Sequence, residues 1–277
     1  MIPNIRIMFD SCAICVCVYN SERFLPKTLK VIDTTAGLFK RCHIFFAFDN
    51  GQDKSGEILE EYVKGEPLAQ IIPGSGRVHI SRVANIAEAR NNCLTAIRQL
   101  SDVPLIFIML DANYSVQTDY RPNILVRHLE NADEWDALTF NRKPYYDLWA
   151  LSFGYHKLSL WHIKDGMKEC YEKAMVDTFE SEMKRVGKGN YLCVDSAFCG
   201  FGVYKTSVFI DGKYDVTWNP ELLLSSNQAK CYMKPGIIRE DYACIHDCEH
   251  RNFHGEAKQL RNAKIMIAND QLFKPDV

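Results

Sequence analysis

The chain has 277 residues, of which 47% are hydrophobic and 25% charged, and its formal net charge is -2. This composition is typical of a globular protein with a sizeable core and excludes an intrinsically disordered chain. No block of Lys and Arg stands out, so no nucleic-acid partner is predicted. No apolar run reaches the roughly 18 residues that a membrane span needs, so no transmembrane segment is predicted.

The N-terminal segment and the cysteines indicate a cellular location. Asp10 interrupts the first apolar stretch, which makes a poor signal peptide. Several of the 11 cysteines lie inside apolar runs, where a thiol packs as a small hydrophobic group. The pairs Cys12–Cys15 and Cys244–Cys248 are isolated, and free or structural thiols are favoured over zinc ligands. We expect a cytoplasmic, soluble protein, or a chain trimmed of its anchor.

Strands and helices alternate along the first half. The predicted strands are short apolar runs at residues 13–18, 43–48, 70–73, 105–110 and 136–140. The predicted helices are amphipathic segments at residues 23–34, 55–63, 86–100 and 122–131. Residues 158–185 are expected to be helical in parts, and residues 191–204 to contain a strand. Repeated strand–helix units predict a Rossmann-like α/β fold with a mostly parallel central sheet flanked by helices.

Polar residues follow three of the predicted strands. Asn20, Asp49 and Asp111 each come directly after, or close to, the carboxyl end of an apolar strand. In a parallel sheet these ends line the ligand crevice. The sequence therefore predicts that these three side chains share one binding site.

The tripeptide Asp111-Ala112-Asn113 places two oxygen-bearing side chains after a buried strand. Mg²⁺ and Mn²⁺ prefer oxygen ligands and usually share them with substrate phosphates. This predicts a divalent cation held by Asp111 and Asn113. An aspartate in this position also caps a turn, and the tripeptide alone does not decide between the two roles.

Two further features suit a nucleotide but also have purely local explanations. Arg90, in a predicted helix, can pair with a diphosphate through its planar guanidinium, or form a surface salt bridge. Asp49 opens a polar turn and can accept a hydrogen bond from a base, although such turns also form for local reasons.

The order of four motifs carries more information than any one of them. VYNSERFL, FDNGQDKS, ARNNCL and FIMLDAN follow one another between residues 18 and 113. This order resembles the nucleotide-binding half of GT-A glycosyltransferases over roughly residues 13–115. The resemblance implies one domain, with a nucleotide-sugar-binding half at residues 1–135 and an acceptor-binding half at residues 136–277. It departs from the pattern at Asn50 and Asn113, where Asp is common, which leaves the choice of metal open.

The resemblance also implies roles for single residues. The nucleotide would lie near Tyr19 and Asn20, with its base on Asp49. The diphosphate would lie on Arg90, and the ribose and metal on Asp111 and Asn113.

Three segments of the second half look like parts of a diverse glycosyltransferase group that includes fungal capsule-type mannosyltransferase-like proteins and microbial and viral relatives. They are PYYDLWAL, VDSAFCGFGVYK and CEHRNFH, which begin at residues 144, 194 and 248. In GT-A enzymes a late His can complete the metal shell, which makes His250 and His254 candidates, with His246 third. Each of these histidines can equally be a surface or core residue.

Sugar transfer also needs an acceptor hydroxyl made nucleophilic, and an inverting enzyme uses a carboxylate base for this. The candidates are Asp195, Asp247 and Glu249, with the Glu240-Asp241 pair as a further possibility. They leave inversion and retention equally open. Aromatic side chains that can stack on sugars, or simply pack in the core, are Tyr145, Tyr146, Trp149 and Trp218.

Together these features predict a metal-dependent glycosyltransferase using Mn²⁺ or Mg²⁺. It would move a hexose or pentose from a UDP- or GDP-sugar to a hydroxyl of a glycan or glycoprotein acceptor. One alternative is a non-catalytic carbohydrate-binding protein on the same scaffold. The other is a sugar-phosphate nucleotidyltransferase, which is disfavoured because residues 18–25 lack the glycine-rich loop such enzymes carry.

Overall fold

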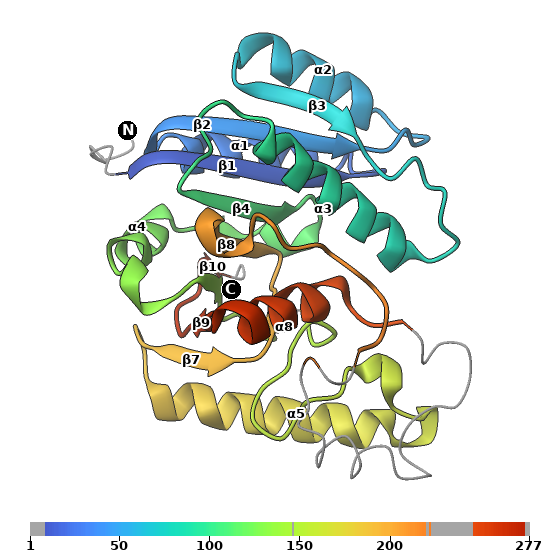
Figure 1. Cartoon of the computed structure of the whole chain (residues 1–277), viewed down its shortest axis with the longest axis vertical. Coiled ribbons are helices and arrows are strands. Elements are labelled where there is room, and N and C mark those ends of the chain that lie inside the picture. The colour runs from blue at the N-terminus through green and yellow to red at the C-terminus, as the bar shows by residue number, and fades with distance from the viewer. Residues whose placement is uncertain (1–8, 146, 220–221, 223–245, 275–277) are drawn as a thin grey trace.

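The computed structural model describes residues 9–145, 147–219, 222 and 246–274. Within these residues, eight strands form one sheet in the order β3-β2-β1-β4-β8-β6-β9-β7 (Figure 1). Its strands are β1 (Phe9–Val18), β2 (Phe39–Phe48), β3 (Ala69–Pro73), β4 (Ile106–Asp111), β6 (Ala137–Phe140), β7 (Tyr191–Val194), β8 (Phe201–Lys205) and β9 (Ile265–Ala268). A small second sheet pairs β5 (Asp119–Tyr120) with β10 (Phe273–Lys274).

The pairing of the strands confirms the predicted α/β fold with a mostly parallel sheet. β1 pairs in parallel with β2 and β4, β2 with β3, and β6 with β9. β8 runs antiparallel to β4 and β6, and β7 runs antiparallel to β9. The carboxyl ends of β1, β2 and β4 therefore meet at one edge, as the positions of the polar residues predicted.

Helices cover both faces of the sheet, which explains why its central strands are apolar along their whole length. In β1, Cys12, Ile14 and Val16 belong to the core on one face, and Ala13 and Cys15 to the core on the other. The first core is completed by α1 (Leu25–Ala36), α2 (Ser55–Gly65) and α4 (Pro122–Glu130). The second is completed by α3 (Arg82–Arg98), α5 (Asp165–Val186), α6 (Thr206–Phe209) and α8 (Glu249–Arg261).

Two parts of the second half differ from the prediction. Residues 191–204 hold one strand and most of a second, β7 and β8, because residues 195–200 turn the chain between them. The helix α8 was not predicted at all. Its first turns bury Glu249, His250 and Arg251, and charged residues at buried positions do not mark a core-facing helix in the sequence.

The cysteines of the described residues are free thiols, most of them buried. Cys12, Cys15, Cys42 and Cys93 pack in the two cores, in agreement with their predicted role as small hydrophobic groups. Cys244 lies outside the described residues, as do Glu240, Asp241 and Tyr146.

Candidate active site

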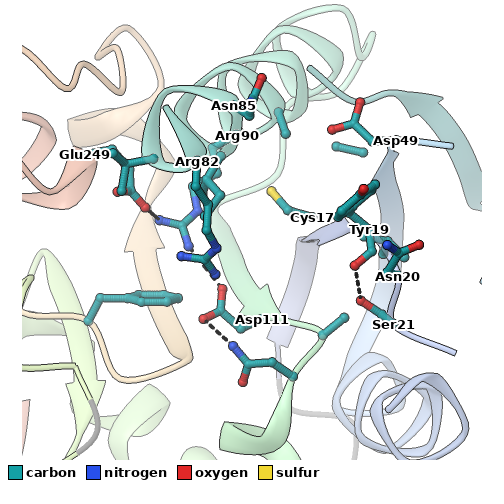
Figure 2. Close-up of a pocket in the computed structure, with 18 of the residues that line it drawn as sticks. Cys17, Tyr19, Asn20, Ser21, Asp49, Arg82, Asn85, Arg90, Asp111 and Glu249 are labelled. Atoms are coloured by element: carbon teal, nitrogen blue, oxygen red, sulfur yellow. Dashed lines mark hydrogen bonds and ion pairs between the residues drawn. The ribbon is translucent and has the colours of Figure 1, made fainter. Parts of the chain in front are cut away.

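A cavity of about 510 Å³ lies at the carboxyl ends of β1, β2 and β4. Its volume is within the range of small-molecule sites. Figure 2 shows Tyr19 and Asn20 on one side of it, Arg90 and Glu249 on the other, and Asp111 between them. Six of the sequence-predicted nucleotide and metal residues line this single cavity: Tyr19, Asn20, Asp49, Arg90, Asp111 and Asn113.

Asp111 ends β4 and points into the cavity between two protein donors. Its Oδ1 accepts a hydrogen bond from Nη2 of Arg90 at 3.1 Å, and its Oδ2 from Nδ2 of Asn113 at 3.2 Å. The amide oxygen of Asn113 accepts a hydrogen bond from the backbone N–H of Ser115 at 2.8 Å. Asn113 therefore caps the short turn after β4 and orients Asp111.

Arg90 lies at the back of the cavity in a buried network of charges. Its Nη1 donates to Oε1 of Glu249 at 2.5 Å and also contacts Nε2 of His250. Burial by itself lowers the pKa of Arg90, but the carboxylates of Glu249 and Asp111 reverse this and raise its pKa well above the usual value. The guanidinium is thus charged, and two carboxylates already balance its charge.

Asp49 and the loop after β3 hold each other in place. Its Oδ1 accepts from the backbone N–H of Gly76 at 2.7 Å, and its Oδ2 from the hydroxyl of Ser75 at 2.7 Å. A Cβ on Gly74 would lie 2.6 Å from the Asp49 carboxyl group, so only glycine permits this approach.

Asn20 joins the loops that follow β1 and β2. It adopts a positive φ of 47°, and its Oδ1 accepts from the backbone N–H of Gln52 at 2.9 Å. A Cβ on Gly51 would lie 1.9 Å from this oxygen, which makes glycine necessary there. Beside it, the guanidinium of Arg77 lies 3.8 Å from the centre of the Tyr19 ring. The loops after β1, β2 and β3 therefore form one wall that carries an exposed cation and an aromatic ring.

Arg82 lines the same cavity and was missed by the sequence analysis. It is the first residue of α3, is exposed, and forms no ion pair with any described residue. Figure 2 shows it on the same side of the cavity as Arg90. Unlike Arg90, it therefore offers an unbalanced positive charge to a ligand. An Arg at the start of an otherwise ordinary helix gave no signal that it faces a cavity.

Asp147 is a second lining residue that the sequence analysis missed. Its Oδ1 accepts a hydrogen bond from the backbone N–H of Ala150 at 3.1 Å. Burial, and then the nearby charges of Glu249 and Asp111, raise the pKa of Asp147 to about 7. Within the described residues no cation is paired with it. It belongs to the segment PYYDLWAL, in which the sequence marks only the aromatic residues as candidates for sugar binding.

The three carboxylates predicted to act as the base have different surroundings. Glu249 lines the cavity but is paired with Arg90. Asp195 pairs with Lys157 and, at 2.9 Å, with Lys258. Asp247 is buried and pairs with Arg251 at 2.8 Å. Of the three, the described cavity wall includes Glu249 and neither of the others. The geometry thus gives structural partners to Asp195 and Asp247 and does not bring them to the site.

The histidines predicted as metal ligands lie behind the cavity wall. The ring of His250 stacks on Phe198 with centroids 3.9 Å apart, and burial lowers its pKa well below the usual value. His254 faces Ser196 at 3.0 Å and Tyr204 at 3.3 Å, and burial lowers its pKa to about 3. Both rings are packed and partnered inside the core. His246, the third candidate, also lies away from the described cavity wall.

A divalent cation fits the oxygen-rich wall of the cavity better than it fits a closed protein site. Among the described residues, no three His, Cys, Asp or Glu side chains are arranged to hold a metal. Asp111 nevertheless lines the cavity, and the side-chain amide of Asn113 orients its carboxylate. Mg²⁺ is usually bound by one or two carboxylates together with substrate phosphates. The donor set therefore suits a cation that arrives with a diphosphate.

The aromatic residues predicted to stack on sugars are divided between core and cavity. Tyr145 is buried, with its ring centre 4.6 Å from that of Phe179. Trp218 stacks on His162 with centroids 4.3 Å apart. Trp149 lines the cavity.

Comparison with known proteins identifies a family model that matches the chain. Residues 13–177, more than half of the chain, match the family model described as glycosyl transferase family 2. No curated protein sequence matches the chain. In the part of the chain that the structure describes, no helix combines the length and apolar character that crossing a membrane requires.

Solved structures of glycosyltransferases are similar to this chain at low sequence identity. GalNAc-T7 with UDP, GalNAc and Mn²⁺ matches with a TM-score of 0.50 and 11% identity, over 96% of this chain and 42% of that one. TarS residues 1–349 from S. aureus matches with a TM-score of 0.44 and 13% identity, over 96% of this chain and 59% of that one. Mannosyltransferase PcManGT from Pyrobaculum calidifontis, in complex with GDP-Man and Mn²⁺, matches with a TM-score of 0.43 and 11% identity. The match covers 78% of this chain and 51% of that one. The chain thus spans about 60% or less of the length of these proteins.

Proposed function

Because the chain belongs to glycosyl transferase family 2, and hence to the GT-A glycosyltransferases that its motifs resemble, we propose that its cavity binds a nucleotide-diphospho-sugar. The sugar would pass to a hydroxyl of a glycan or glycoprotein. One observation carries the proposal: Asp49, Arg82 and Asp111 come from three separate elements and line one cavity. UDP- and GDP-sugars are the donors that we expect.

The nucleoside would bind on the wall made by Tyr19, Asn20 and Asp49. Asp49 is held by Ser75 and Gly76 and is nearly buried, so a donor N–H on the base would find a fixed acceptor. The Tyr19 ring and the Arg77 guanidinium beside it offer flat surfaces to the base or ribose. A wall of this kind fixes orientation before reaction, which is where enzymes gain much of their rate.

The diphosphate would bind to Arg82, with Arg90 acting behind it. The charge of Arg90 is balanced by Glu249 and Asp111, whereas Arg82 is exposed and free of ion pairs with the described residues. An uncompensated guanidinium gives charge-assisted, bidentate hydrogen bonds to phosphate. We therefore assign the direct contact to Arg82, and to Arg90 the positioning of Asp111.

Mn²⁺ or Mg²⁺ is part of the proposal, with Asp111 as its protein ligand. The GalNAc-T7 structure holds Mn²⁺ together with UDP. When bound, such a cation offsets the negative charge of the leaving diphosphate. Asn113 would support the site through its hydrogen bond to Asp111.

The acceptor hydroxyl needs a base, and Asp147 is better placed for this than the residues predicted from the sequence. Glu249 is engaged by Arg90, whereas Asp147 faces the cavity with no paired cation among the described residues. As the new glycosidic bond forms, the hydroxyl proton would pass to the Asp147 carboxylate and the nucleoside diphosphate would leave. Direct displacement of this kind inverts the configuration of the anomeric carbon, so we propose an inverting transferase.

Donor binding can be measured through the melting temperature, because a ligand that binds the native state stabilises it. We expect a UDP- or GDP-sugar to raise the melting temperature in Mn²⁺ or Mg²⁺, and EDTA to remove the shift. At a donor concentration about 100 times Kd, the gain is about 2.7 kcal/mol. Asp111→Asn should remove the metal-dependent shift, and Asp177→Asn, on an exposed position of α5, should keep it.

The same measurement can contradict the proposal. If no nucleotide sugar raises the melting temperature with any cation, the donor site is wrong, and binding of glycans alone would favour a non-catalytic carbohydrate-binding protein. If Asp111→Asn behaves like Asp177→Asn, Asp111 has no part in holding the cation.

A further inference from the structure

Part of the cavity wall is formed by two tryptophans that are not among the proposed donor contacts. Trp149 and Trp161 both line the cavity, and their ring centres lie 4.7 Å apart at an interplanar angle of 62°. Trp149 is 36% exposed. These residues come from the segment between β6 and α5, whereas the nucleotide wall comes from the loops after β1 and β2.

Packing of the core does not account for this pair. Neither Trp149 nor Trp161 belongs to the two core clusters, although the buried Trp135 does. An indole that stays in contact with water forgoes the large stabilisation that its burial would give. Two such rings in contact inside a cavity therefore point to a ligand with an apolar surface.

The tryptophan pair is held from behind by a fully buried serine. The Ser159 hydroxyl donates to the backbone carbonyl of Trp149 at 3.3 Å and accepts from the backbone N–H of Trp161 at 3.4 Å. Leu158 and Leu160, on either side of Ser159, are buried as well. The backbones that carry the two rings are thus tied together, and the rings also contact each other, so less ordering would be needed when a ligand binds.

Three polar groups near the pair show how a ligand would be oriented. Asp147 precedes Trp149 by two residues and lines the same cavity. Tyr114, 58% exposed, follows Asp111 closely in sequence and lines the cavity too. Lys168 of α5 lies with its Nζ 5.6 Å from the centre of the Trp149 ring. The platform is therefore apolar on its rings and polar at its edges.

We propose that Trp149 and Trp161 form the acceptor subsite, and that the acceptor is a glycoside whose sugar ring packs its C–H face against them. A pyranose ring has one apolar face and a rim of hydroxyls, which matches an indole platform bordered by polar groups. A hydroxyl of the stacked ring would then face Asp147. This proposal rests on the proposed transferase function, and it selects a sugar in place of a peptide as the acceptor.

The test uses p-nitrophenyl glycosides of common hexoses as probes, with a Ser/Thr-rich peptide as the competing acceptor class. Direct binding to the whole chain is followed by saturation-transfer NMR, and transfer by release of the nucleoside diphosphate from the donor that raises the melting temperature. We expect Trp149→Ala and Trp161→Ala to raise the KM for the glycoside at least tenfold and to leave the donor-induced shift in melting temperature unchanged. Trp149→Phe should recover most of the loss, and Tyr155→Ala, an exposed aromatic residue away from the described cavity wall, should have no effect.

The two proposals fail in different ways. An unchanged KM in both tryptophan variants, or transfer to the peptide and to no glycoside, would overturn the acceptor subsite while leaving the transferase intact. If no donor binds but a glycoside binds in a Trp149-dependent way, the rings bind a sugar, but the transferase and the acceptor role that rests on it both fail. If Trp149→Ala loses donor binding as well, the rings belong to the donor site and the inference is wrong.

Discussion

Asp147→Asn is expected to lower kcat by about 10²–10⁴-fold, the usual contribution of a general base. The asparagine keeps the size of the side chain and its hydrogen bond from Ala150, but it cannot accept a proton from the acceptor hydroxyl. The donor should still bind, because the proposed donor contacts lie on Tyr19, Asp49 and Arg82. The measurement is steady-state turnover together with the donor-induced shift in melting temperature.

The same variant should also change how stability depends on pH in the ligand-free protein. The pKa of Asp147 is about 7 in the folded chain, whereas an unfolded aspartate titrates near about 3.9. The folded state therefore binds this proton more tightly, so raising the pH from 4 to 7 costs folding free energy. The full difference corresponds to about 4 kcal/mol, and we expect about half of it because the side chain is partly exposed.

Asp147→Asn should consequently increase the free energy of unfolding by about 2 kcal/mol at pH 8, with a gain that shrinks toward zero at pH 4. Chemical denaturation at several pH values measures this. Asp177→Asn, on an exposed position, provides the control. A variant that loses turnover without gaining stability at pH 8 would contradict the raised pKa. Loss of turnover in Asp195→Asn, with none in Asp147→Asn, would restore the base predicted from the sequence.

The nucleotide half of the fold was predictable because its strands are buried on both faces. Runs such as residues 13–18 and 105–110 are apolar without alternation, which is typical of parallel strands covered by helices. Polar residues that directly follow such runs must lie at the carboxyl edge of the sheet. Asp49 and Asp111 were located by this reasoning, and the structure brings them to one cavity.

The second half was harder because its functional residues follow no periodic pattern. α8 buries Glu249, His250 and Arg251, so a helix prediction based on an apolar stripe fails there. Asp147 lies in a loop between β6 and α5, where its spacing from other residues carries no information about its surroundings. Its raised pKa arises from burial and from Glu249, about a hundred residues away in sequence, and such proximity exists only in the folded chain.

Charge balance explains why the sequence identified one arginine and missed the other. The segment ARNNCL marks Arg90 by resemblance, and in the structure this residue is only 4% exposed and is paired with Glu249 and Asp111. Arg82 lies eight residues earlier, with no motif around it, and is exposed to the cavity. The motif thus locates the region where positive charge is needed. Which arginine can contact the ligand depends on which one has no carboxylate partner among the described residues.

Arg90→Ala is expected to destabilise the protein by about 3–5 kcal/mol, the usual cost of breaking a buried ion pair by removing one partner. It would leave the Glu249 carboxylate buried without its cation and remove a donor from Asp111. Arg82→Ala should change stability by less than about 0.5 kcal/mol, as is usual for surface positions. It should nevertheless weaken donor binding by about 1.5–3 kcal/mol, the range for hydrogen bonds to charged groups.

One double variant separates charge balance from ligand contact. Replacing Arg90 and Glu249 together with methionine removes both buried charges, and such replacements are often neutral for stability. We therefore expect the double variant to regain most of the stability lost in Arg90→Ala, as measured by denaturant unfolding. If Arg90→Ala is instead as stable as the natural chain and loses donor binding, then Arg90 contacts the diphosphate directly. If Arg82→Ala binds the donor normally, the exposed guanidinium of Arg82 has no part in the site. Arg90 would then have to leave its ion pairs with Glu249 and Asp111 in order to contact the donor.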